Sequence, residues 1–174
     1  MNTRTLMLMR HGKSDWTTDT PWDFDRPLKA RGENACQLMA QWLAVHGPKP
    51  DRVVTSTATR ALETTSALRK DLQLISAQIH EDQRIYDACV ETLLQVIKTH
   101  GAESKTLLLV GHNPGFENLL MFLSNAPLPP SNNGKLMPTA ALATLTHYGA
   151  WDELTFGCCS DATVVRPRDL LART

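Results

Sequence analysis

The sequence has no excess of charge of either sign and no long hydrophobic run. Lysine plus arginine and aspartate plus glutamate each number 18 among 174 residues. Because this balance leaves no global basic field, we do not expect binding to nucleic acid or to an anionic membrane. The first apolar run, Leu6–Met9, is too short for a signal peptide or a membrane-spanning helix. We therefore expect a soluble, cytoplasmic protein.

Cysteine is scarce, with Cys36, Cys89, Cys158 and Cys159 as its four positions. Their spacing is not that of a metal site, and an adjacent pair does not suit an ordinary disulfide. We interpret all four as reduced thiols, as is typical of a cytoplasmic protein. The chain has no internal repeat, and its length suits one domain with a real core, so residues 1–174 are predicted to form a single domain.

What the sequence does contain is three apolar segments that read as buried strands and are followed by basic or imidazole side chains. The segments are residues 6–9, 52–55 and 105–111, and the side chains are Arg10, His11, Arg60 and His112. Amphipathic helical patterns alternate with these strands, which predicts a mostly parallel sheet with helices on both faces. Ligands of such sheets bind outside the carboxyl ends of the strands, where these four side chains are expected.

These residue types suit phosphoryl transfer. A phosphoryl group carries nearly two negative charges, and a planar guanidinium such as that of Arg10 or Arg60 can hold two of its oxygens. A neutral imidazole is a nucleophile near pH 7, which fits His11. His112, at the end of a different strand, would stabilise charge on the transferring group.

The combined motifs resemble those of the histidine phosphatase superfamily, which has the phosphoglycerate mutase-like fold, and most closely its short SixA-type phosphohistidine phosphatases. The resemblance covers nearly the whole chain. Its carriers are the sequences at Arg10–Trp16, Asp25–Leu28, Arg31–Gly32, Arg60–Thr64, Leu107–Gly115, Pro138–Leu142 and Trp151–Leu154.

The resemblance implies a three-layer α/β sandwich and a phosphatase that needs no metal or other cofactor. His11 would be the phosphorylated nucleophile, and Arg10, Arg60 and His112 would form the phosphate pocket. The family usually places an acidic residue before the central short helix, where Asp87 is the candidate general acid. Asp15 is a weaker candidate. Further substrate-binding candidates lie beside the two histidines: Gly12, Lys13, Ser14 and Asn113.

Several elements and side chains are assigned structural roles. Helices are expected at residues 31–46, 58–72, 91–99 and from Pro114, with Asn113 as the cap of the last. Residues 79–85 form an edge strand or an extended segment, and 140–146 and 154–158 form two final strands. Arg26 and Arg31 either line the pocket or, as we expect, pair with the acidic loop, and His147 is expected in solvent.

The chain leaves room for one short helix between Asp87 and the strand at 105, where larger relatives insert a lid. We therefore expect an open pocket, which favours a phosphate displayed on a protein, such as the histidine domain of a phosphorelay. The alternatives are a phosphatase for a small phosphomonoester, such as a sugar phosphate or nucleotide, and a module that binds phosphate without turnover. A zinc site is disfavoured, since zinc takes three or four ligands and two cations flank the histidines.

Overall fold

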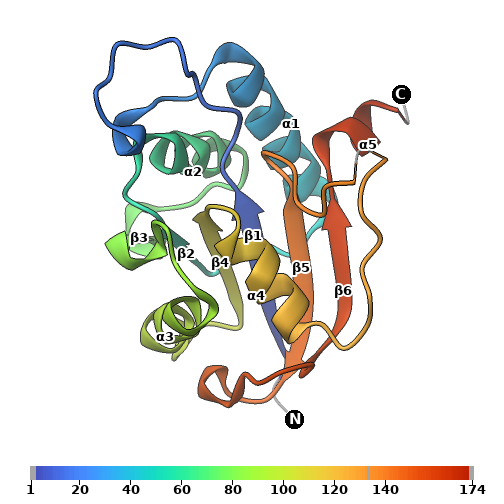
Figure 1. Ribbon diagram of the computed structural model, residues 1–174. Coiled ribbons are helices and arrows are strands. Elements are labelled where there is room, and N and C mark those ends of the chain that lie inside the picture. The colour runs from blue at the N-terminus through green and yellow to red at the C-terminus, as the bar shows by residue number, and fades with distance from the viewer. Residues whose placement is uncertain (1–2, 133, 173–174) are drawn as a thin grey trace.

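The computed structural model describes residues 3–132 and 134–172 and is organised around one six-stranded sheet (Figure 1). The strand order is β3-β2-β4-β1-β5-β6. The strands are β1 (Thr3–Arg10), β2 (Arg52–Thr55), β3 (Ile79–Glu81), β4 (Thr106–Gly111), β5 (Leu142–Tyr148) and β6 (Cys159–Val165). Only the pairings that involve β5 are antiparallel, so the sheet is mostly parallel, as the sequence predicts.

Helices cover both faces of this sheet (Figure 1). They are α1 (Ala30–His46), α2 (Thr59–Asp71), α3 (Val90–Gly101), α4 (Gly115–Leu123) and α5 (Pro167–Leu171). Four short 3-10 helices lie at Asp23–Asp25, Ser76–Gln78, Gln83–Ile85 and Trp151–Glu153. The α/β three-layer architecture expected from the alternating patterns is therefore confirmed.

The alternation of side chains along β1 explains why its sequence is apolar throughout. Leu6 and Leu8 pack into the core under α3 and α4, whereas Met7 and Met9 pack into the core under α1 and α2. Successive side chains of a strand point to opposite faces, so a strand covered on both faces needs an apolar residue at every position. In the part of the chain that the structure describes, no helix is long and apolar enough to cross a membrane.

The sequence-based prediction for the final strand is wrong. Residues 154–158 form a turn rather than a strand, and β6 begins at Cys159. The alternation of Leu154, Phe156 and Cys158 is misleading, because Phe156 is 77% exposed and Gly157 has a φ of +67°. A positive φ turns the chain at this point and ends any extended segment.

The predicted cap of the fourth helix is also wrong. α4 begins at Gly115 after Pro114, which has helical backbone angles and no side-chain cap. The amide of Asn113 instead donates to the backbone carbonyl of Met137, 3.0 Å away. Asn113 thus joins the start of α4 to the segment that enters β5.

Two glycines bring the chain after β1 against α1. A Cβ on Gly12 would lie 2.6 Å from Cys36 Sγ and 2.9 Å from the carbonyl oxygen of Gly32. A Cβ on Gly32 would lie 2.2 Å from the carbonyl oxygen of Lys13. Because both contacts involve buried neighbours or backbone, only glycine permits this approach. The contact fixes the backbone that follows His11.

We predict that Gly32→Ala displaces the backbone at Lys13 and impairs both stability and function. The overpacking should cost about 1–3 kcal/mol of unfolding free energy. Urea denaturation and oxyanion binding would measure the two effects. Gly47→Ala, at the other end of α1, is a matched control, since its Cβ meets chiefly the flexible Cδ1 of Leu43. Equal losses in both variants would contradict the prediction.

Candidate active site

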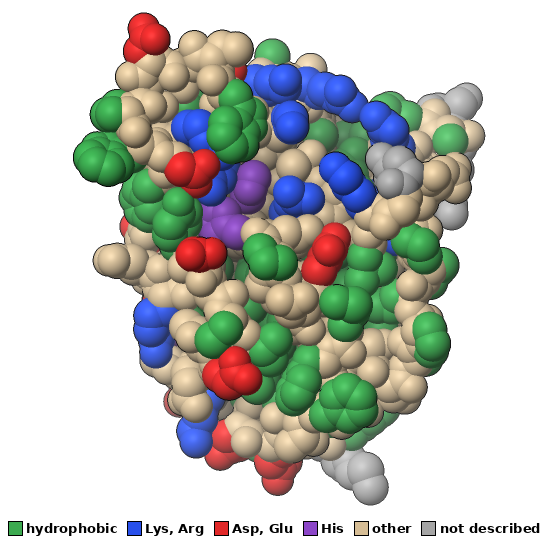
Figure 2. Space-filling view, in the orientation of Figure 1, with side chains coloured by type: hydrophobic (Ala, Val, Ile, Leu, Met, Phe, Trp, Pro, Cys, Tyr) green, Lys and Arg blue, Asp and Glu red, His purple; other side chains and the backbone are tan. Residues whose placement is uncertain are grey.

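The strand order brings the predicted site residues to one edge of the sheet. β1 and β4 are adjacent and parallel, and they end directly before His11 and His112. β2 lies next to β4 and leads through Ser56 into α2, whose first turn carries Arg60. Figure 2 shows histidine side chains at the bottom of a hollow on this edge, with basic and acidic side chains around it.

His11 is buried and oriented by its own loop. Its Nδ1 lies 2.6 Å from the carbonyl oxygen of Gly12, which assigns the proton to Nδ1, since only a donor can bond a carbonyl. Nε2 therefore carries the lone pair of the ring, and Arg60 Nε donates a hydrogen bond to it from 3.3 Å. Burial lowers the pKa of His11 to about 3, with smaller contributions from Arg60, Arg10 and the charge that His112 would carry if protonated, although the Gly12 bond opposes this. The imidazole is neutral at physiological pH and can act as a nucleophile at Nε2.

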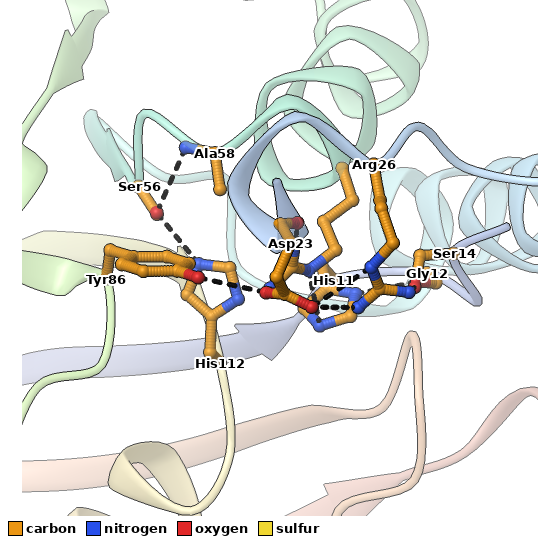
Figure 3. Close-up of polar contacts among 10 residues, drawn as sticks. His11, Gly12, Ser14, Asp23, Arg26, Ser56, Ala58, Tyr86 and His112 are labelled. Carbon is orange, nitrogen blue, oxygen red and sulfur yellow. Dashed lines mark hydrogen bonds and ion pairs between the residues drawn. The ribbon is translucent and has the colours of Figure 1, made fainter. Parts of the chain in front are cut away.

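His112 faces His11, with ring centroids 5.0 Å apart (Figure 3). Its Nε2 lies 2.8 Å from Ser56 Oγ, which also accepts a bond from the Ala58 amide. When the hydroxyl donates its own proton to Nε2, the ring proton of His112 lies on Nδ1. Burial and the charges of Arg60 and Arg10 lower the pKa of His112 to about 4, with Asp23 opposing. His112 is thus a neutral N–H donor.

Two buried nitrogen atoms of this cluster have no hydrogen-bond partner among the described residues: Arg10 Nε and His112 Nδ1. Arg10 donates from its Nη1 to the Met137 carbonyl, 2.9 Å away, which fixes the guanidinium. A buried donor without a partner is costly, and such groups are uncommon in folded proteins. An oxyanion between the histidines would satisfy both donors.

A carboxylate lies over the cluster. Asp23 bonds Arg60 Nη2 at 2.9 Å, Arg26 Nη2 at 2.5 Å and the hydroxyl of Tyr86 at 2.9 Å (Figure 3). Partial burial alone would raise the pKa of Asp23, but the bonds from Arg26 and Tyr86 and the charge of Arg60 lower it to about 2. Asp23 is therefore ionised and engages Arg60, one of the groups expected to hold a phosphate.

Arg26 anchors the loop that carries Asp23. It donates from Nη1 to Ser14 Oγ at 2.8 Å, and its guanidinium lies 3.4 Å from the centroid of the Trp16 ring. The expected pairing of Arg26 with the acidic loop is confirmed. Arg31 is exposed and makes no ion pair among the described residues.

The pocket is less open than expected, since His11 and His112 are only 8% and 7% exposed.

The remaining candidates lie outside the contacts of this cluster. The side chain of Lys13 is exposed, and Asp15 accepts bonds from Thr17 in a local turn. Asp87 is exposed at a turn with a φ of 53°. Within the described residues, its carboxylate has no hydrogen bond or ion pair with the cluster. Its role as a general acid stays a prediction.

Sequence reasoning missed Asp23, Ser56, Thr64 and Tyr86 as members of the site. Thr64 accepts the Gly12 amide at 3.0 Å and donates to the Arg60 carbonyl at 2.7 Å, so it ties the loop that follows His11 to α2. Ser56 was predictable, because it directly follows a parallel strand. Asp23 and Tyr86 had no such signal, since they reach the cluster from a 3-10 helix and from a loop.

A phosphoglycerate mutase-like α/β sheet that holds paired neutral imidazoles and arginines at its carboxyl edge defines a class of phosphate-handling proteins. The model of the histidine phosphatase superfamily (branch 1) matches residues 6–93. An uncharacterized protein of Mycobacterium tuberculosis is 33% identical over 156 residues, which cover 87% of this chain and 95% of the relative. The chain belongs to the histidine phosphatase superfamily.

Within the superfamily the chain resembles the SixA group. The phosphohistidine phosphatase SixA of Escherichia coli is 30% identical over 144 residues, covering 81% of this chain and 84% of the relative. The solved structure of a SixA-type protein from Nakamurella multipartitia superposes with a TM-score of 0.81 at 30% identity. It covers 96% of this chain and 98% of that one. The resemblance stated from the sequence is confirmed.

We predict that Asp23→Asn tightens oxyanion binding by roughly tenfold, because it removes the carboxylate that competes for Arg60. Calorimetric titration with inorganic phosphate or vanadate would measure the change. Asp25→Asn is the matched control, since it makes the same change on the same loop but its carboxylate has no ion pair among the described residues. Unchanged or weaker binding in Asp23→Asn would contradict the prediction.

The lowered pKa values of His11 and His112 predict that acid destabilises the folded protein. In the unfolded chain His112 takes up a proton near pH 6.5, whereas in the folded protein its pKa is about 4. The unfolding free energy should therefore be highest above pH 6.5 and fall as the pH drops toward 4. The contribution of His112 is at most about 3 kcal/mol. The paired histidines titrate jointly, so the apparent values belong to the pair.

Urea denaturation of His112→Asn from pH 4 to pH 7 would test this. We expect a shallower dependence of unfolding free energy on pH than in the wild type. His46→Asn, on the exposed end of α1, is the control and should keep the wild-type slope. An unchanged slope in His112→Asn would show that burial of this imidazole does not set the acid limit.

Proposed function

We propose that the protein is a metal-independent phosphatase that hydrolyses phosphohistidine on proteins through a covalent intermediate on His11. The observation that carries the proposal is a pair of buried nitrogens that have no hydrogen-bond partner among the described residues, Arg10 Nε and His112 Nδ1, together with the lone pair of His11 Nε2. The arrangement supplies a nucleophile together with donors for the oxygens of the group it attacks.

In the proposed first step, the lone pair of His11 Nε2 attacks phosphorus in line with the bond to the substrate nitrogen. That P–N bond breaks, and its electron pair stays on the substrate nitrogen, so that a neutral imidazole leaves when the other ring nitrogen of the phosphohistidine carries a proton. Arg10, Arg60 and His112 hold the three remaining phosphoryl oxygens. Water then attacks phospho-His11, which releases inorganic phosphate and restores the free imidazole.

The protonation states favour phosphohistidine over a phosphate ester. An alkoxide leaving group needs a proton from a general acid. Asp23 is the carboxyl group in contact with the cluster, and its pKa of about 2 leaves it ionised. A substrate imidazole is a better leaving group and has less need of such an acid. The likeness to the E. coli phosphohistidine phosphatase supports the same choice.

The rim of the site supports a protein as the substrate carrier. Trp16 and Trp22 are 71% and 69% exposed, and both lie on the loop that positions Asp23. Exposed aromatic side chains are enriched where proteins dock. A folded phosphoprotein could therefore contact this loop while its phosphoryl group enters between the histidines.

The test is single-turnover labelling with a protein that carries radioactive phosphohistidine. We expect acid-labile, alkali-stable label on the wild type and none on His11→Ala, whose turnover should fall by at least on the order of 10³-fold. His46→Ala removes an exposed imidazole and should label normally.

The same preparations would be offered small phosphomonoesters, including a sugar phosphate and a nucleotide. Faster turnover of these than of the phosphoprotein would reassign the substrate to a small metabolite. Phosphate binding without label or turnover from any donor would instead make the protein a recognition module. Label that persists on His11→Ala would remove His11 as the nucleophile.

A further inference from the structure

A second cluster of reactive side chains lies at the opposite end of the sheet from His11. His147 is the sixth residue of β5, Cys159 begins β6, and the two are direct partners across the antiparallel pair. Cys158 immediately precedes Cys159. His147 also pairs with Arg4, near the start of β1, whereas His11 follows its end. The cluster is therefore separate from the phosphate-handling site.

The geometry of the cluster matches that of a bound metal ion. The two sulfur atoms lie 3.8 Å apart, and a ring nitrogen of His147 completes a set whose atoms are all within 4.8 Å of one another. Zinc–sulfur bonds of about 2.3 Å at a tetrahedral angle place two sulfurs about 3.8 Å apart. The sulfur atoms thus already have the separation that a zinc ion requires.

The state of His147 is an independent indication of a ligand. The sequence-based expectation that this imidazole is solvated is wrong, since it is only 4% exposed. Nε2 lies 2.9 Å from the Ala150 carbonyl and so carries the ring proton. Nδ1 is then a buried lone pair, and it has no partner among the described residues.

This arrangement is typical of metal-binding histidines. A ligating imidazole donates its second nitrogen to a backbone carbonyl or carboxylate, which fixes the tautomer and the ring plane. In His147 the bond to the Ala150 carbonyl fixes the tautomer. The stacked ring of Trp151, whose centroid lies 6.5 Å away at an interplanar angle of 27°, restrains the plane of the imidazole. The imidazole is oriented before any ion arrives.

The cluster also has a route to solvent. Cys159 is fully buried, whereas Cys158 is half-buried and its sulfur accepts the Thr155 amide from 3.3 Å. An ion held by the three side chains would be reached from the side of Cys158. Two thiolates and an imidazole are ligands that zinc prefers, and a water molecule can complete its tetrahedron.

We propose that His147, Cys158 and Cys159 bind one Zn²⁺ ion, with water as the fourth ligand. Each thiol transfers its proton to solvent as its Zn–S bond forms, and the imidazole donates the Nδ1 lone pair without losing a proton. The bound ion links β5 to the start of β6 and to the turn that precedes it. It stabilises this end of the sheet and takes no part in the chemistry at His11.

The test uses the whole, reduced, metal-free chain, titrated with Co²⁺ without oxygen. We expect one cobalt ion per chain, with a thiolate-to-cobalt charge-transfer band and the strong visible absorption of tetrahedral Co²⁺. Zn²⁺ should abolish both signals and raise the melting temperature. Absence of the charge-transfer band, or a melting temperature that does not respond to Zn²⁺, would overturn the proposal.

Matched variants locate the site. Cys158→Ser replaces a half-buried thiol with little change in shape and should weaken Zn²⁺ binding by at least roughly 100-fold. Cys89→Ser removes an exposed thiol elsewhere and should bind as the wild type does. His147→Gln should weaken binding while keeping the charge-transfer band of the two thiolates. Wild-type affinity for Zn²⁺ in Cys158→Ser, or weakened binding in Cys89→Ser, would refute the assignment.

Discussion

Burial of nitrogen-bearing side chains around His11 is the constraint on which the rest of the site depends. Desolvation disfavours a protonated imidazole, so His11 and His112 remain neutral. A buried arginine cannot lower its desolvation cost by losing a proton, because its guanidinium keeps its charge. Arg60 therefore bonds the carboxylate and the backbone carbonyl of Asp23, and Arg10 bonds the Met137 carbonyl. The loops around the pocket are thus held by the cations that they cover.

Under the proposed function, the same constraint links entry of the substrate to the loop that carries Asp23. Asp23 is an anion that already bonds Arg60, and an incoming phosphoryl group presents a second anion to the same guanidinium. The phosphoryl group must displace the carboxylate of Asp23, or be excluded by it, since a guanidinium forms a bidentate pair with one anion at a time. Asp23 is nearly half exposed, so water can solvate it when it is displaced. Its release would also loosen Tyr86, which lies edge-on against His112.

Sequence patterns predicted the sheet, the helices and the convergence of the four candidate side chains for one physical reason. Parallel strands end at the same edge, so Arg10, His11 and His112 converge whatever the details of the loops. Asp23 and Tyr86 escaped prediction because long loop connections, not strand register, bring them to the cluster. The strand at residues 154–158 was misplaced because alternating apolar residues can lie on an exposed turn as well as on a strand.

That misplaced strand also concealed the cluster at the far end of the sheet. Ligand spacing along the chain identifies a metal site when a short turn supplies the ligands. Here His147 and Cys159 meet through antiparallel register, which depends on where β6 begins. If the strand covered residues 154–158 as predicted, Cys158 and Cys159 would lie at its far end, away from His147 in the turn. The start of β6 at Cys159 instead sets its thiol beside a buried imidazole, so the chemistry there follows from register and not from any local motif.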